Sequence, residues 1–319
     1  MRVAVVDIGT NSTRLLVADV SDGGHLTERE RRTKVTRLGD KLDQTGVLSD
    51  EAMERVLATL AEYRTVVDRE GAERAVAVLT SAVRDAANGE EFLARVRAQS
   101  DGLDARVIAG DEEARLTFRG ATSERAARDA TPTLVIDVGG GSTELVVGRG
   151  GEVSFHVSTQ AGVVRHTERH LASDPPTPSE LRALADDVRE TYARAVPGAV
   201  RRTPRAAIAV AGTATSLGAI DLDLEHYSTD LVHGHAVPLT ACRSILERLA
   251  ALPEAERREV RGLHPDRAPT IVAGVVMVVE ALELFGLDAI VVSDHDILRG
   301  AALEAVHRPR PNGEAAPTS

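Results

Sequence analysis

Short continuous apolar runs alternate along this chain with segments whose apolar residues recur at helical spacing. The apolar runs predict buried strands at residues 3–8, 14–20, 75–80, 106–108, 134–138, 144–147, 206–210 and 289–292. The helical spacing predicts helices over residues 49–70, 89–99, 111–120, 181–195, 239–251, 271–285 and 297–306. Strands interleaved with helices in this way indicate an α/β fold.

The predicted helix over 49–70 has recognisable ends. Ser49 precedes the first apolar residue and is a favourable N-cap, because its hydroxyl can accept a hydrogen bond from a free backbone N–H. Gly71 follows the last periodic residue and is suited to the left-handed backbone that ends many helices. Both ends therefore support a helix of about six turns.

One sequence pattern occurs twice. VAVVDIGTNSTRLLVADV fills residues 3–20 and TLVIDVGGGSTELVVGRG fills residues 133–150. A shift of 130 positions superposes Val5, Asp7, Gly9, Ser12, Thr13, Leu15 and Val17 on identical residues. We infer a duplication, in which each half opens with a β-hairpin. Two such halves would place similar loops on opposite sides of a cleft, where each loop holds one side of the same ligand.

The first repeated loop has the composition of a phosphate and metal site. Asp7 ends a strand and can hold a hard cation directly or through water. Gly9 lets the backbone approach a ligand closely, and successive N–H groups of Thr10, Asn11 and Ser12 can form an anion-binding nest.

The second repeated loop carries a stronger version of the same chemistry. Its glycines, Gly139, Gly140 and Gly141, leave the turn without side chains and expose N–H groups to phosphate oxygens. Asp137 and Glu144 add two carboxylates, which suit a divalent cation.

Two further segments offer chemistry with an ordinary alternative. Asp111, Glu112 and Glu113 lie at a predicted helix start, where acids complement the helix dipole. A carboxylate held among other carboxylates can instead have a raised pKa and act as a general base towards water. Arg84 follows a strand and can grip phosphate in bidentate fashion or form a surface ion pair.

Histidines and basic residues give weaker signals. His233 and His235 are two apart, so on a strand they would share a face, but no third metal ligand is evident. We interpret SDHDILRG as a polar loop that caps the last helix. The segment RERRTKVTRLGDK, residues 29–41, concentrates cations that suit either a polyanion track or a solvated edge.

Composition and charge exclude several classes of protein. The net charge of −11 argues against a general nucleic-acid binder. Cys242 is alone, so no internal disulfide can form, and we expect a reducing, cytoplasmic location. The chain opens directly into a predicted strand, which argues against a signal peptide. The longest apolar run, at 271–284, contains Glu280 and Glu283 and is too short to span a membrane.

Five motifs together resemble those of a known family. VDIGTNSTRLLVADV, TSAVRDAAN, GDEEARL, VIDVGGGSTELVVG and VAGTATSLGAI occur in the order seen in exopolyphosphatase/guanosine pentaphosphate phosphohydrolase (Ppx/GppA) proteins of the actin-like ATPase superfamily. The resemblance extends from Val3 to about Ala302. It implies an α/β fold of duplicated ribonuclease-H-like domains flanking a cleft.

The resemblance also suggests where these domains end. We expect the first domain at residues 1–125, joined by a C-terminal helix at about 297–308, and the second at residues 126–296. Residues 309–319 have the composition of a disordered tail. Longer members carry a further C-terminal phosphohydrolase-like domain, so the chain resembles the short form, and the resemblance favours a homodimer.

The same resemblance assigns roles to individual residues. Glu113 resembles the catalytic base, with Glu112 as the fallback, and Arg84 an arginine that faces the phosphates. The expected Mg²⁺-linked acids are Asp7, Asp137 and Glu144. The expected phosphate-loop residues are Thr10, Asn11, Ser12, Gly139, Gly140, Gly141 and Ser142, and Gly212 and Thr213 match a loop that faces a nucleoside in ATP-binding relatives.

The function expected from these roles is Mg²⁺-dependent exopolyphosphatase activity, which releases phosphate from the end of inorganic polyphosphate. Three alternatives stay open. The chain could be a guanosine pentaphosphate 5′-phosphohydrolase, a nucleotide-using kinase or ATPase of the same superfamily, or a catalytically weak sensor that binds alarmone nucleotides. The basic residues at 29–41 favour polyphosphate slightly.

Overall fold

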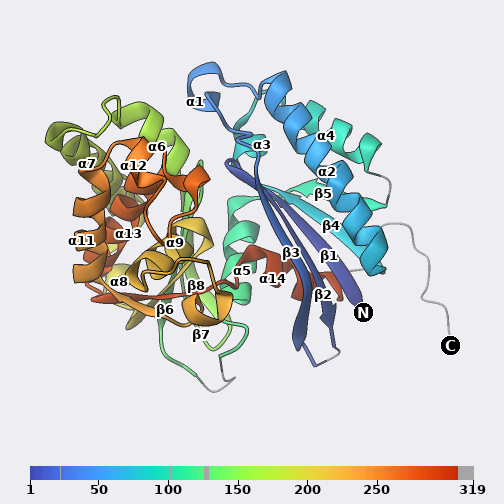
Figure 1. Cartoon of the computed structure of the whole chain (residues 1–319). Coiled ribbons are helices and arrows are strands. Elements are labelled where there is room, and N and C mark those ends of the chain that lie inside the picture. Colours follow the sequence, from blue (N-terminus) through green and yellow to red (C-terminus); the bar gives the residue numbers. More distant parts are fainter. Residues whose placement is uncertain (22, 101, 126–128, 308–319) are drawn as a thin grey trace.

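Two mixed β-sheets, each covered by helices, make up the molecule in a computed structural model (Figure 1). The structure describes residues 1–21, 23–100, 102–125 and 129–307, so the tail expected at 309–319 lies outside the described residues. We call the five-stranded sheet and its helices the first lobe, and the six-stranded sheet and its helices the second lobe. None of the helices in the described part of the chain combines the length and apolar character that crossing a bilayer requires.

The first sheet has the strand order β3-β2-β1-β4-β5. Its first three strands form an antiparallel meander, and the last two run parallel to β1. The strands are β1 (Arg2–Ile8), β2 (Ser12–Val20), β3 (Leu26–Val35), β4 (Arg74–Leu79) and β5 (Leu103–Val107).

The second sheet repeats this order and adds one strand. It reads β8-β7-β6-β9-β11-β10, again with an antiparallel meander followed by two strands parallel to its first, and β10 is antiparallel to β11. The strands are β6 (Thr133–Val138), β7 (Thr143–Arg149), β8 (Glu152–Thr159), β9 (Ala206–Val210), β10 (Ala236–Pro238) and β11 (Ala289–Val292). The shared order confirms the predicted duplication and the predicted fold class.

Helices cover the outer face of each sheet (Figure 1). In the first lobe they are α1 (Leu42–Thr45), α2 (Asp50–Glu70), α3 (Ser81–Asp85) and α4 (Gly89–Gln99). In the second they are α6 (Val163–His170), α7 (Pro178–Ala195), α8 (Gly198–Arg201), α9 (Ala211–Asp221), α10 (Thr229–Val232), α11 (Leu239–Ala250), α12 (Glu254–Arg257), the 3₁₀ turn Pro265–Arg267 and α13 (Ile271–Phe285).

Two further helices, α5 (Gly110–Ala121) and α14 (Ile297–Ala305), lie between the sheets (Figure 1). Because side chains alternate along a strand, Val3 and Val5 of β1 face inward and pack against α14 and Leu116 of α5. On the opposite side of α5, Phe118 packs against Val135 and other inner residues of the second sheet. The α5 helix therefore contributes to the packing of both lobes.

The two central helices approach closely where each carries a glycine. A Cβ added to Gly300 of α14 would overlap the Leu116 carbonyl group of α5. A Cβ added to Gly120 of α5 would overlap the Asp296 carbonyl group at the start of α14. These glycines allow backbone-to-backbone packing at the crossing, which brings α14 against the first lobe.

Most predicted elements are present, with revised ends. The Ser49 hydroxyl accepts a hydrogen bond from Ala52 N, and Gly71 has a φ of 66°, so both predicted ends of α2 are confirmed. The helix predicted from residue 181 begins earlier, because Thr177 and Glu180 form a reciprocal capping box. The sequence reasoning did not predict β3, β8, β10, α6 or α9, nor the short helices α1, α3, α8, α10 and α12.

Candidate active site

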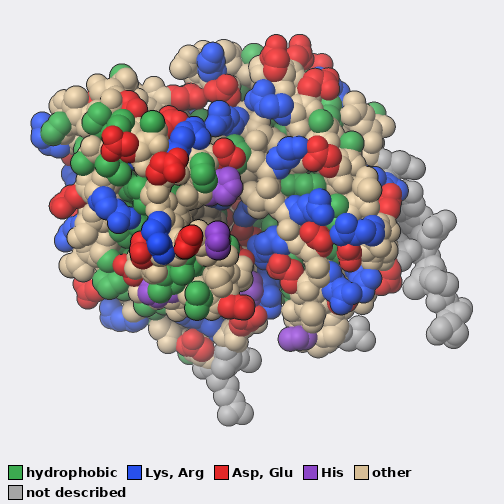
Figure 2. Space-filling view, in the orientation of Figure 1, with side chains coloured by type: hydrophobic (Ala, Val, Ile, Leu, Met, Phe, Trp, Pro, Cys, Tyr) green, Lys and Arg blue, Asp and Glu red, His purple; other side chains and the backbone are tan. Residues whose placement is uncertain are grey.

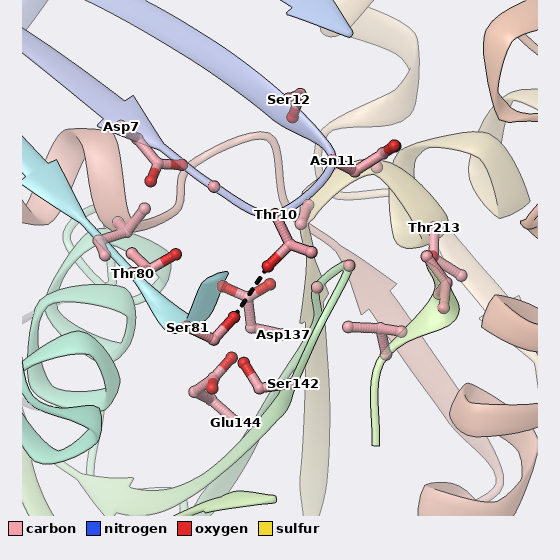
Figure 3. A pocket seen from close by; sticks show the side chains of 18 of the residues that line it. Asp7, Thr10, Asn11, Ser12, Thr80, Ser81, Asp137, Ser142, Glu144 and Thr213 are labelled. Atoms are coloured by element: carbon pink, nitrogen blue, oxygen red, sulfur yellow. Dashed lines mark hydrogen bonds between the residues drawn. The ribbon is translucent and has the colours of Figure 1, made fainter. Parts of the chain in front are cut away.

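A pocket opens between the lobes where the two repeated loops meet, and a hollow is visible near the centre of the face in Figure 2. The loops approach from opposite sides, one bearing Thr10 and the other Ser142 (Figure 3). Twelve of the fourteen predicted site residues line this pocket: Asp7, Thr10, Asn11, Ser12, Glu113, Asp137, Gly139, Gly140, Ser142, Glu144, Gly212 and Thr213. Thr80 and Ser81, which the sequence reasoning did not select, also line it.

The two loops have the same internal turn and pack on each other. Gly9 N donates to Ser12 O at 3.0 Å, and Gly139 N donates to Ser142 O at 2.9 Å. The Gly139 N–H is therefore engaged within the turn, which differs from its predicted role as a phosphate donor. A Cβ on Gly140 would lie 3.0 Å from Asn11 N, so glycine is needed there for the opposite loop to approach.

Gly141 serves the same close approach. A Cβ at this position would lie 2.9 Å from Thr10 Oγ1, which itself is hydrogen-bonded to Ser81 Oγ at 2.9 Å. Gly141 lines a small neighbouring pocket with Arg165 rather than the main pocket. The third glycine of the motif thus contributes to the packing between the lobes.

The first loop carries its own cation. Arg14, the cross-strand partner of Asp7, places Nη2 at 2.6 Å and Nε at 2.9 Å from Asp7 Oδ2. Its Nη1 pairs with Asp296, which begins α14. Burial raises the pKa of Asp7, and Arg14 only partly opposes this. For Asp296, Arg14 and Arg31 more than offset burial and hold the pKa below its usual range.

The second loop has the opposite electrostatic character. At the position equivalent to Arg14 it carries Glu144, which is the cross-strand partner of Asp137. Burial raises the pKa of Asp137 to about 7 despite Arg14. Burial, together with Glu113 and Asp137, raises the pKa of Glu144 well above its usual value, although the Ser158 hydroxyl donates to it at 2.7 Å. Two buried acids are cross-strand neighbours here, and neither forms an ion pair with a basic residue of the described ranges.

Glu113 projects into the pocket from the first turn of α5. Burial raises its pKa to about 7, and Arg84 opposes this rise. Arg84 Nη1 lies 2.9 Å from Glu113 Oε2 and 2.9 Å from Ile108 O. Arg84 does not line the pocket and contacts Glu113 instead, which differs from the expectation that it faces phosphates. Glu112 pairs with Arg106 at 2.6 Å outside the pocket, so the geometry favours Glu113 over the fallback.

Two charged residues that line the pocket, Arg14 and Arg267, were missed by sequence reasoning, and so was Asp296, which pairs with Arg14. Asp296 caps α14 through Leu298 N, as the polar-loop interpretation predicted, and its second oxygen pairs with Arg14. The guanidinium of Arg267 lies against Gly212, where a Cβ would overlap it. Burial lowers the pKa of Arg267 to about 10, and no acidic partner bonds its side chain within the described ranges.

The sequence offered a signal for one of these residues. Aligning the two repeats places Arg14 opposite Glu144, and this change of charge at an equivalent strand position marks both as site residues. No comparable pattern surrounds Arg267, which reaches the pocket from a turn far along the chain.

The basic segment lies largely on β3, an exposed edge strand of the first sheet. Lys34 pairs with Glu62 at 2.7 Å, Arg31 with Glu28 at 2.9 Å and Arg32 with Glu30 at 3.2 Å. These cations are neutralised locally, as is common on an edge strand. The structure therefore favours the interpretation as a solvated edge over that of a polyanion track.

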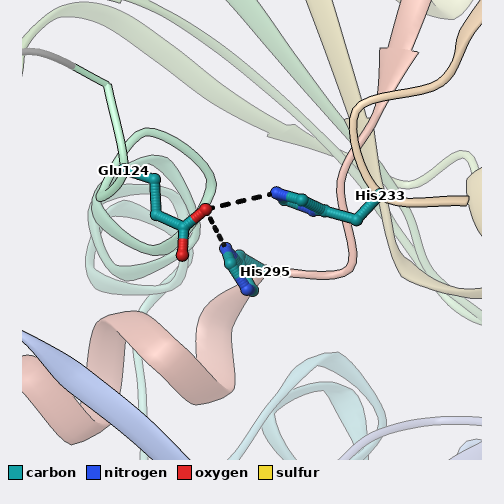
Figure 4. Close-up of side chains that lie close together, drawn as sticks. All are labelled: Glu124, His233 and His295. Carbon is teal, nitrogen blue, oxygen red and sulfur yellow. Dashed lines mark ion pairs between the residues drawn. The ribbon is translucent and has the colours of Figure 1, made fainter. Parts of the chain in front are cut away.

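The two histidines that were expected to share a strand face diverge. His235 Nε2 lies 2.7 Å from Asp221 Oδ2. His233 instead points towards Glu124 and His295, at the junction between the lobes (Figure 4). Neither histidine lies in a strand, because β10 begins at Ala236, so the condition for a shared face is not met.

Comparisons with known proteins agree with the resemblance seen in the motifs. Residues 16–308 match the sequence profile of the Ppx/GppA phosphatase family. Exopolyphosphatase 2 of Mycobacterium tuberculosis is 39% identical over 313 residues, which cover 95% of this chain and 98% of that protein.

Solved structures agree as well. A crystal structure of an exopolyphosphatase-like protein has a TM-score of 0.89 and 34% identity, covering 97% of this chain and 99% of that one. A Ppx/GppA family member from Aquifex aeolicus has a TM-score of 0.80 and 32% identity, covering 96% and 98% respectively.

Proposed function

This chain belongs to the Ppx/GppA phosphatase family, and from that membership we propose that it is a Mg²⁺-dependent exopolyphosphatase. The family and the related exopolyphosphatase make the chain a phosphoanhydride hydrolase. The observation that carries the proposal is the position of Glu113, a buried carboxylate with a pKa near 7, beside two phosphate-type loops. We propose that the terminal phosphoryl group lies between these loops.

The loops supply neutral donors for phosphate oxygens. Thr10 and Ser142 of the loops, with Ser81 of α3 beside them, place hydroxyl groups around the pocket, and the glycine turns keep Cβ atoms away from the ligand (Figure 3). In phosphoryl transfer, positioning and charge stabilisation provide most of the acceleration. We therefore expect the loops to position the reacting group for attack by water.

The acidic residues fit a divalent cation. Asp7 Oδ1 is buried and has no hydrogen-bond partner. Asp137 of β6 and Glu144 of β7 are partners on adjacent strands. Carboxylate oxygens of this kind are the ligands Mg²⁺ prefers. Asp137 and Glu144, with Asp7, would hold the ion, which would neutralise phosphoryl oxygens when bound. Because Arg14 already compensates the first loop, the second loop has the greater need of a cation.

Glu113 would act as the general base. A base with a pKa near the working pH combines a sufficient ionised fraction with a useful affinity for the proton. The bond from Arg84 fixes the Glu113 carboxylate and favours its ionised form. Glu113 would therefore orient the attacking water and take its proton, with Arg84 as a positioning residue rather than a phosphate ligand.

Arg267 favours polyphosphate over a nucleotide substrate. The resemblance suggested that Gly212 and Thr213 face a nucleoside, but the Arg267 guanidinium occupies the space beside Gly212. A buried cation without an acidic partner among the described residues suits a second phosphate group better than a base. We propose that Arg267 binds the phosphate next to the one released.

Phosphate release by the purified protein with Mg²⁺ tests the proposal. The substrates are long-chain polyphosphate, short-chain polyphosphate, guanosine pentaphosphate and ATP. We expect release from polyphosphate, and we expect Glu113→Gln to lower turnover by ~10²–10⁴-fold, because that is the usual contribution of a positioned base. Near-normal turnover by this variant would refute the assignment of the base.

Each remaining outcome identifies an alternative. Release from guanosine pentaphosphate alone would make the chain an alarmone phosphohydrolase. Consumption of ATP only with a phosphoryl acceptor would indicate a kinase. Tight alarmone binding without release would indicate a sensor.

A further inference from the structure

A cluster of metal-type ligands lies on the second lobe, outside the pocket. His166 and His170 are one turn apart on α6, and Asp187 faces them from α7. His170 Nε2 lies 2.7 Å and His166 Nε2 lies 3.5 Å from the same atom, Asp187 Oδ2. One ligand atom from each residue lies within 4.8 Å of the other two. None of the three residues lines the candidate active site.

His166 has no evident structural reason to be a histidine in the absence of an ion. Its side chain is 1% exposed, and neither ring nitrogen makes a hydrogen bond; the contact of Nε2 with Asp187 Oδ2, at 3.5 Å, is an ion-pair distance. Buried polar atoms without a partner are rare in folded proteins and call for an explanation.

We propose that His166, His170 and Asp187 form a binding site for a transition-metal dication such as Zn²⁺. Two imidazoles and one carboxylate are a usual ligand set for this ion, with bonds of about 2.0–2.2 Å and a fourth position for water. Histidines separated by four residues on a helix present their rings on one face. The ion would satisfy the buried His166 ring and join α6 to α7.

Arg169 is the charged group that competes with the ion. Its Nη1 lies 3.4 Å from Asp187 Oδ2, while its Nη2 lies 2.8 Å from Asp43 of the first lobe. Arg169 can therefore release Asp187 and keep an acidic partner. The competition predicts that metal binding strengthens when Arg169 is replaced by glutamine.

The second histidine cluster of the described chain differs in its proton positions (Figure 4). His233 Nδ1 accepts a hydrogen bond from Asp294 N, and His295 Nε2 accepts one from Arg299 Nη1. A neutral imidazole carries its proton on the nitrogen that does not accept. His233 Nε2 and His295 Nδ1, which face Glu124, therefore carry the protons and donate towards its carboxylate. Neither offers a lone pair to an ion, so this cluster is the matched control.

Titration with Co²⁺ tests the site, because four-coordinate Co²⁺ absorbs visible light strongly and occupies zinc sites. Excess Mg²⁺ occupies oxygen-only sites during the titration, since imidazole ligands favour the transition metal. The full chain is compared with His170→Gln, Asp187→Asn, Arg169→Gln and the control His233→Gln. The replaced ligands are partly exposed, and circular dichroism checks that each variant is folded.

We expect one Co²⁺ per chain, displaced by Zn²⁺. We expect His170→Gln and Asp187→Asn to bind more than about 100-fold more weakly, because loss of even an outer-shell partner costs about 10–100-fold. His233→Gln should bind as the native chain does. The proposal would be overturned if the native chain gave no Co²⁺ spectrum that Zn²⁺ abolishes. It would also be overturned if His170→Gln bound Co²⁺ as tightly as the native chain does. The readout is metal binding, so it is independent of which phosphoanhydride the enzyme hydrolyses.

Discussion

Replacing Arg14 with glutamine should destabilise the fold by about 3–5 kcal/mol at neutral pH, because a buried ion pair loses one partner. Arg14 is shared by two buried carboxylates, those of Asp7 and Asp296, whose side chains are 6% and 3% exposed. Glutamine keeps part of the side-chain volume but removes the positive charge. Both acids are then left in the low-dielectric interior beside Asp137.

The magnitude follows from the two ion pairs. At an effective dielectric constant of about 20, unit charges about 4 Å apart attract by about 4 kcal/mol, so two pairs give about 8 kcal/mol before other costs. Removing the buried guanidinium also removes its own desolvation penalty of several kcal/mol. The difference agrees with the cost usually measured for breaking a buried pair.

The pH dependence has a definite sign. Arg14 helps hold the pKa of Asp296 below its usual range, so its stabilising effect is present above the unfolded pKa of about 3.9 and is lost as the pH falls through the folded value. In the variant the pKa values of Asp7 and Asp296 rise, and protonation then relieves the unpaired charge. The stability deficit should therefore be larger at pH 7.5 than at pH 5.

Urea unfolding followed by circular dichroism measures the deficit, since the chain has no tryptophan. The control is Arg32→Gln, which breaks an exposed ion pair on the edge strand and should cost under about 1 kcal/mol. A loss of under about 1 kcal/mol for Arg14→Gln at pH 7.5, or a larger loss at pH 5, would show that Arg14 does not compensate these carboxylates.

Three further predictions concern the base, the helix crossing and the basic edge. Arg84→Gln should move the acid limb of the kcat/KM pH profile to higher pH, because Arg84 lowers the raised pKa of Glu113 and the base must be ionised. Arg84→Lys should restore the native position of this limb. A rise in KM with an unmoved limb would instead indicate that Arg84 is a phosphate ligand. Gly300→Ala should destabilise the fold by at least about 1–3 kcal/mol in urea, since its Cβ meets the backbone of α5; equal stability would contradict the close crossing. Lys34→Ala should leave KM for long-chain polyphosphate unchanged within twofold, because Glu62 already neutralises Lys34; a large rise would revive the polyanion track.

The sequence predicted the elements whose packing gives a strong periodic signal. Buried strands such as β1 and β6 are continuous apolar runs, and α2 carries both a periodic face and end signals. The edge strand β3 was missed because only Leu26 in it is buried and six of its ten residues are charged, so no alternation marks it. The α6 helix was missed because only two of its residues are buried, and one of these is His166.

The site was predictable where its chemistry is local. The paired loops are visible as a repeat, and their glycines mark backbone approach. Arg14 and Arg267 were not predicted, because an arginine on a strand or in a turn is usually a solvated side chain. Their role depends on Asp296 and Gly212, which are distant in the sequence and meet them only in the folded chain.

The return of α14 to the first lobe has a consequence for the order in which the protein is made. Leu298 and its neighbours cover the inner face of β1, yet the ribosome produces them after every strand of the second sheet. Until then Val3 and Val5 lack their covering helix, and α5, which carries Glu113, lacks its close contact with Gly300 of α14. The first lobe is therefore translated before the second but gains its covering helix after it.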